Sequence, residues 1–196
     1  DEDGNTALIL AAYFGHKKIV KALLKKEGID VNIADKKGNT ALMRAAYKGH
    51  KEIAKALLEI KGIDVNAANK SGNTALIWAA YNGDKEIAEA LLEKEGINVN
   101  AADKDGNTAL ILAADYGHKE IADALLEKEG IKVNAANNDG DTALISAIRE
   151  GHKEIADALL KKEGIDVNAA DKKGNTALIS AIRERHKEIA EALLEK

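Results

Sequence analysis

The chain carries five histidines, and histidine is the side chain that most often binds metals and transfers protons near neutral pH. All five occur at the same place in a 34-residue repeat. Neighbouring histidines should therefore lie about 8 to 10 Å apart, which is the distance between packed helices. A metal centre needs ligand bonds of roughly 2 Å, so this pattern predicts no metal site. The five residues are His16, His50, His118, His152 and His186.

Most copies also hold Thr, His and Asp, which together could supply a nucleophile, a general base and a group that orients the base. A catalytic site is one constellation, whereas these residues recur in copy after copy, which favours capping and turn hydrogen bonds. The glycines occur in Gly-Asn-Thr and do not form a phosphate-binding loop motif. The chain has no cysteine, which excludes thiol catalysis, disulfides and cysteine-ligated zinc. We therefore expect no catalytic residues and no cofactor.

The elements that position these side chains repeat without insertion or deletion. A constant period of 34 residues indicates stacked supersecondary units, each of which buries its apolar face only against its neighbours. The motif Gly-Asn-Thr-Ala-Leu begins at Gly4, Gly38, Gly72, Gly106 and Gly174, with Gly-Asp-Thr-Ala-Leu at Gly140. The sequence therefore predicts a single repeat domain over residues 1–196, with repeats at 1–34, 35–68, 69–102, 103–136, 137–170 and 171–196.

Composition narrows the classes of partner. The net charge is -4, from 29 Lys and Arg against 33 Asp and Glu, and no block of like charge occurs, so nucleic acid is not an expected partner. No apolar run approaches the roughly 20 residues of a membrane span, and the first residues lack a secretory signal pattern. We expect a soluble chain without a membrane partner. The lack of cysteine suits an intracellular or a recombinant protein equally, so the compartment stays open.

Within the third copy, Thr74 precedes an apolar run and is a good N-cap, which predicts a first helix over residues 75–82. Gly83 would end this helix in the left-handed conformation, and Asp84 could cap a second helix that runs to about residue 95. The second helix has one apolar stripe and one charged side. Residues 97–100 read as an extended segment, followed by a turn that places Gly106 at positive φ.

A 34-residue period also occurs in tetratricopeptide repeats, but those are almost wholly helical, and about a dozen residues per copy are non-helical here. The chain instead resembles ankyrin repeats along its whole length. In the family pattern, Pro stands where this chain has Ala41, and a histidine stands where it has Met43. The resemblance implies an all-α, ankyrin-type helix-turn-helix solenoid of six 34-residue repeats with projecting β-turn tips. The matching residues in the second copy are Gly38, Thr40, Leu42, Ala45, Ala46, Gly49, His50, Leu57, Leu58, Asp64, Val65 and Asn66.

All aromatic residues fall at three variable positions of the first helix. One position holds Trp78 in one copy and Arg44 or Ser146 in others, and close-packed cores resist such changes of volume and charge. We therefore expect the three positions to face solvent. Tyr and Trp often carry interface energy, so these side chains are candidates for partner contacts.

The resemblance to ankyrin repeats implies that these positions line a concave groove beside the turn tips. The predicted function is a non-catalytic protein-binding module with a protein or peptide ligand on this concave face. The alternative is an engineered or consensus scaffold with no evolved partner, because the framework is nearly identical between copies. The candidate site residues are Tyr13, Phe14, Lys36, Lys37, Asn39, Arg44, Tyr47, Lys48, Lys70, Ser71, Trp78, Tyr81, Asn82, Lys104, Asp105, Asp115 and Tyr116.

The two ends of the array differ. The last two copies share Leu-Ile-Ser-Ala-Ile-Arg-Glu, starting at Leu144 and Leu178, and the last copy has Arg185 in place of the glycine between its helices. Terminal repeats need a polar outer face, so these changes predict a partial cap at the C-terminal end. The first copy shows no polar cap. We expect a chain that is mostly monomeric with some end-to-end association.

Overall fold

A computed structural model describes residues 1–195 and contains twelve α-helices in that range. The chain forms two compact units, unit 1 (Asp1–Lys104) and unit 2 (Asp105–Lys196), with three helix pairs each. The pairs of unit 1 are α1 (Ala7–Tyr13) and α2 (Lys17–Leu24), α3 (Ala41–Tyr47) and α4 (Lys51–Leu58), and α5 (Ala75–Asn82) and α6 (Lys85–Leu92). Those of unit 2 are α7 (Ala109–Asp115) and α8 (Lys119–Leu126), α9 (Ala143–Arg149) and α10 (Lys153–Leu160), and α11 (Ala177–Arg183) and α12 (Lys187–Leu194).

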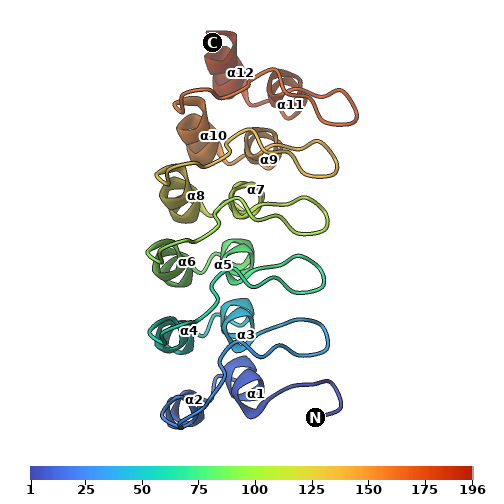
Figure 1. The fold of residues 1–196 in the computed structure, drawn as a ribbon. Helices are drawn as coiled ribbons and strands as arrows, with labels where there is room; N and C mark the ends of the chain where they lie inside the picture. Colours follow the sequence, from blue (N-terminus) through green and yellow to red (C-terminus); the bar gives the residue numbers. More distant parts are fainter. Residues whose placement is uncertain (196) are drawn as a thin grey trace. The chain divides into compact units, whose positions relative to one another are not determined.

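Each unit has three layers. In unit 1, α3 packs between α1 and α5, and α4 packs between α2 and α6. The first helices lie between the second helices on one side and the projecting turns on the other (Figure 1). Unit 2 repeats this order, with α9 between α7 and α11 and with α10 between α8 and α12. The prediction of all-α helix-turn-helix repeats is confirmed.

The first helices are short and N-capped, and in α5 five of the eight residues are buried. Thr74 precedes α5 in an extended conformation, and its hydroxyl accepts a hydrogen bond from the backbone N–H of Ile77 (3.2 Å). This bond satisfies one of the amides that a helix start leaves unpaired. Ala79 and Ala80 are fully buried, and their small size lets neighbouring first helices approach closely. Gly83 ends the helix with φ 74°, so the predicted bounds and the predicted left-handed cap are confirmed.

The second helices have one buried face. In α6, Ile87, Leu91 and Leu92 are buried, whereas Lys85 and Glu89 are exposed, as the apolar stripe predicts. The predicted end near residue 95 is wrong, because α6 stops at Leu92. A turn closed by a hydrogen bond from the Ile97 N–H to the Lys94 carbonyl (3.3 Å) replaces the last helical turn.

The residues before the second helices do not cap them through their side chains. Asp84 and the five histidines stand at these N-cap positions without a side-chain capping bond. His50 instead donates from Nε2 to the carbonyl of Tyr13 in the preceding repeat (3.1 Å), and His152 donates to the carbonyl of Asp115 (3.2 Å). The predicted side-chain cap is therefore wrong, and two of these histidines tie adjacent repeats together.

The segment after each second helix contains a turn where extended backbone was predicted. Asn98 accepts a hydrogen bond on Oδ1 from the N–H of Asn100 (3.1 Å), which folds the chain locally. Asn66, one repeat earlier, accepts from the Asn98 N–H (2.8 Å) and donates to the Gly96 carbonyl (2.7 Å). The repeating asparagine therefore joins two repeats through hydrogen bonds to backbone groups. These bonds hold the segment in a turn instead of an extended conformation.

The projecting turns stack on one another through their backbones. Lys70 N–H donates to the Lys37 carbonyl and Lys104 N–H donates to the Ser71 carbonyl, each at 2.9 Å. Gly72 has φ 80°, and the predicted positive φ at Gly106 is also found, at 80°. Isolated bridges such as Ala34 to Thr40 flank the turns, and residues 1–195 contain no longer strand.

The C-terminal end of the array is less polar than predicted. Ile179 is 42% exposed and Ile182 is 64% exposed, so the predicted polar cap at the C-terminal end is wrong at these positions. Their equivalents one repeat earlier, Ile145 and Ile148, are 1% and 0% exposed because a further repeat covers them. At the other end, Ile19 is 50% exposed, as the uncapped first copy predicts. The longest described helices have eight residues, and no helix in residues 1–195 is long and apolar enough to cross a membrane.

Candidate ligand-binding face

The three variable positions lie on the first helices, near the projecting turns. Tyr47, Tyr81, Tyr116 and Phe14 are 37%, 40%, 47% and 60% exposed, which confirms that these side chains face solvent. The position of Trp78 is more buried than predicted. Trp78 itself is half-buried, and the residues at the equivalent sites include the buried Leu112, Ser146 and Ser180. This position therefore lies closer to the packed layer than the other two positions do.

In unit 1, four aromatic side chains form a row, here called the aromatic row and defined by Tyr13, Tyr47, Trp78 and Tyr81. The Tyr47 and Trp78 ring centroids are 4.7 Å apart, and those of Trp78 and Tyr81 are 6.0 Å apart, both in edge-to-face orientation. The Lys48 ammonium bridges the remaining gap, at 4.7 Å from the Tyr13 ring and 5.1 Å from the Tyr47 ring. Such ring and cation contacts hold the row in place across three repeats.

Two further aromatic residues lie where first helices end. Phe14 stacks on His16 at 6.0 Å between ring centroids and meets Tyr13 edge-on at 5.0 Å. Tyr116 stacks on His118 at 6.3 Å in unit 2. Asn82 holds the same position in the third copy, and its Nδ2 donates to the Tyr47 carbonyl (2.9 Å). Asn82 is exposed but is partly committed to the preceding repeat.

Two predicted site residues are held in a buried polar network inside the second turn. Arg44 pairs with Asp35 (2.6 Å), whose side chain is only 3% exposed. Burial raises the pKa of Asp35, but hydrogen bonds from Asn39, Arg44 and Lys37 outweigh it and hold that pKa below its usual value. Asn39 is 6% exposed and donates to both Asp35 oxygens (3.1 Å each), so its predicted place on the ligand-facing surface is wrong.

The remaining predicted tip residues are exposed in the structure. In unit 1 these are Lys36, Lys37, Lys70, Ser71 and Lys104, and in unit 2 Asp105. Within residues 1–195, Lys36, Lys37 and Lys70 lie at ion-pairing distance from no carboxylate. These lysines contrast with those on the second helices of unit 1, where Lys17 pairs with Glu52 (2.5 Å) and Lys51 with Glu86 (2.7 Å).

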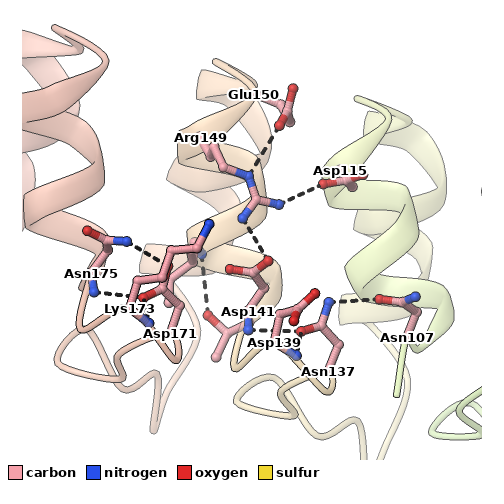
Figure 2. A network of polar contacts seen from close by, with 12 residues as sticks. Asn107, Asp115, Asn137, Asp139, Asp141, Arg149, Glu150, Asp171, Lys173 and Asn175 are labelled. Carbon is pink, nitrogen blue, oxygen red and sulfur yellow. Dashed lines mark hydrogen bonds and ion pairs between the residues drawn. The ribbon is translucent and has the colours of Figure 1, made fainter. Parts of the chain in front are cut away.

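Unit 2 carries a charge network at the equivalent place (Figure 2). Arg149 donates to Asp141 (2.7 Å), Asp115 (3.2 Å) and Glu150 (3.2 Å). Burial lowers the pKa of Arg149, but these acidic partners more than reverse the effect and raise it. Asp115, a predicted site residue, is therefore engaged with Arg149. The sequence does signal this network, because Asp141 is the one Asp at a turn position that is Asn in every other copy.

Two depressions lie in the angle between first helices and turns. One in unit 1 has a volume of about 290 Å³ and is lined by Asn5, Leu10, Tyr13, Phe14, Lys37 and Arg44. One in unit 2 has about 380 Å³ and is lined only by charged residues, among them Asp139, Arg149 and Lys172. A larger depression of about 520 Å³ between α8 and α10 is lined mainly by charged side chains of the second helices. No group of three His, Cys, Asp or Glu suited to a metal ion occurs in residues 1–195.

The stacked helix pairs with projecting turns define a helical repeat protein. A family model described as ankyrin repeats (3 copies) matches residues 1–69, 60–137 and 132–196. Among solved structures, the chain is similar to the crystal structure of EF0377, an ankyrin repeat protein, with a TM-score of 0.87 and 32% sequence identity over 96% of each chain. A search of curated proteins found no match. The chain belongs to the ankyrin repeat family, whose repeats generally mediate protein interactions and are typically non-enzymatic.

Proposed function

We propose that the chain is a non-catalytic binding module that takes a protein or peptide ligand on a concave face formed by first helices and turns. The observation that carries the proposal is the aromatic row, which places large rigid side chains next to solvent at positions that vary between copies. Aromatic side chains that are held in place give contact area at a low entropic cost. The second helices α4, α6, α8 and α10 offer no comparable feature, because their exposed residues are charged and nearly the same in every copy.

Selection of peptides from a random twelve-residue display library on the purified chain tests this function. We expect the selected peptides to lose at least tenfold in affinity for Tyr81→Ala, because its 40% exposed ring can be removed without opening the core. Glu89→Ala, on the opposite side of the same repeat, is the control and should bind as the parent does. The emission of Trp78, the only tryptophan, should change when peptide binds.

Equal binding by the parent and by Tyr81→Ala would exclude this face as the binding site. A chain that is only a scaffold, without any ligand, would yield no peptide above background. Circular dichroism and the melting temperature of both variants should match those of the parent, which separates a lost contact from a lost fold.

We also propose that copies associate end to end. Ile182 and Leu194, 64% and 72% exposed, lie on helices whose internal counterparts are covered by a following repeat, and Ile19 at the first repeat is 50% exposed. A first repeat of another copy therefore offers the kind of surface that covers α9 and α10 within unit 2. The weight-average mass in sedimentation should rise with concentration, and Ile182→Glu should abolish the rise. Tyr116→Glu is the control, and equal behaviour of the two variants would contradict end-to-end contacts.

A further inference from the structure

We propose that the ligand of unit 1 is an acidic peptide with interspersed apolar side chains, and this inference rests on the binding function proposed above. The chain as a whole is acidic, with a net charge of -4. The turns of the second and third copies are nevertheless basic. Lys36, Lys37 and Lys70 are exposed there, and the carboxylate of the second turn, Asp35, is buried and already paired with Arg44. The exposed carboxylates of the adjoining first turn are those of Asp1, Glu2 and Asp3. Positive charge is therefore concentrated at the second and third turns of this face.

The cations of this face are available to a ligand. Lys36, Lys37 and Lys70 have no carboxylate partner in residues 1–195, whereas Lys17 and Lys51 on the second helices of the same unit are paired with glutamates. Lys48 is exposed and rests over the rings of Tyr13 and Tyr47, which leaves its ammonium donors able to meet an incoming carboxylate. A carboxylate that reaches Lys37 or Lys70 displaces water and breaks no existing ion pair.

The same face offers seats for apolar side chains between the cations. The 290 Å³ depression brings Leu10, Tyr13 and Phe14 next to Lys37, so an aliphatic or aromatic side chain can enter it while a neighbouring acid meets the lysine. The exposed Tyr47 and Tyr81 continue the apolar contact toward the third repeat. This arrangement of apolar contacts between cations suits a peptide in which apolar residues lie between the acids.

The spacing of the repeats sets the spacing of the acids. Adjacent first helices lie about 10 Å apart, and an extended chain advances about 3.3 Å per residue. One repeat thus corresponds to about three peptide residues, so we expect acids roughly every third residue opposite Lys36 and Lys70, which hold the same position in adjacent repeats. A polynucleotide suits the face less well, because the cations are few and rings and an apolar depression separate them, whereas backbone binding needs a continuous basic track.

The test begins with the sequences selected from the display library. We expect Asp and Glu to be enriched at least twofold over the input library, and the affinity of a selected peptide to fall when Gln replaces its Glu residues. Lys37→Glu combined with Lys70→Glu should weaken that peptide more than tenfold and reduce the dependence of its affinity on salt. The matched control is Lys25→Glu with Lys61→Glu, which makes the same change of net charge at exposed positions after α2 and α4 and should change affinity less than twofold.

The outcomes separate this inference from the proposed function. Selected peptides that are neutral or basic, yet bind through Tyr81, would overturn the acidic ligand and leave the binding module intact. Peptides that are insensitive to both Tyr81→Ala and the double lysine reversal would overturn both. A selection that enriches no acidic sequence, or a twelve-nucleotide single-stranded DNA that binds as tightly as the selected peptide and responds to the lysine reversal, would also overturn the inference.

Discussion

Gly72→Ala is expected to lower the free energy of unfolding by about 3 kcal/mol, whereas Gly96→Ala costs only about 1 kcal/mol. Both glycines have positive φ, 80° and 73°, so both substitutions force an L-residue into the left-handed region. Only at Gly72 is there also no room. A Cβ there would lie 2.8 Å from the Cα of Asp103 and 2.9 Å from its carbonyl carbon, whereas at Gly96 nothing lies within 4 Å.

Urea unfolding followed by circular dichroism measures the two losses. The neighbour at Gly72 is backbone, which cannot swing away as a flexible side chain can, so the turn must shift and strain its hydrogen bond between Lys104 N–H and the Ser71 carbonyl (2.9 Å). Equal losses for the two variants would show that φ alone decides the cost and that the turns are not closely stacked. A loss at Gly96 larger than at Gly72 would contradict the packing described for the turns.

The recurrence of glycine in the turn thus has two causes, and only one is local. The need for positive φ follows from turn chemistry and could be read from the sequence. The close approach of Gly72 to the next turn depends on the stacking of repeats, which a single copy does not reveal. The helix bounds show a similar division. The sequence predicts the Thr74 cap and the bounds of α5 correctly. It places the end of α6 three residues too late, because the turn that follows α6 is closed by its own hydrogen bonds.

The prediction of the candidate site is correct where the exposure of a side chain follows from the variability of its position. It is wrong where a side chain pairs with a residue from another element. Tyr47 and Tyr81 face solvent as their variable positions predict. Asn39 is an asparagine, as is the equivalent residue in most other turns. It is nevertheless buried, because it donates a hydrogen bond to Asp35, which pairs with Arg44. Arg149 is exposed but is anchored by three carboxylates, one of which, Asp115, lies in the preceding repeat. Such pairings depend on neighbouring elements.

The other large effect is expected in the layer of second helices. Leu57→Ala should cost about 3 to 4 kcal/mol of unfolding free energy, because Leu57 is fully buried in α4 and its loss leaves a cavity. Leu23 occupies the same place in α2 of the first repeat but is only half-buried, since no preceding repeat covers it. Leu23→Ala should therefore cost about half as much. The pair holds chemistry and repeat position constant and varies only the number of neighbours.

The two leucine variants should also differ in how the protein unfolds. In a repeat array, stability is approximately a sum of repeat terms and nearest-neighbour interfaces. α4 packs against both α2 and α6, so a cavity at Leu57 weakens the interfaces on both sides and should broaden the urea transition or split it. A cavity at Leu23 touches one interface only, and its effect should appear as faster amide hydrogen exchange confined to α1 and α2. Uniform loss of protection across unit 1 for Leu23→Ala would contradict nearest-neighbour coupling, because it would mean that the three repeats unfold as one block.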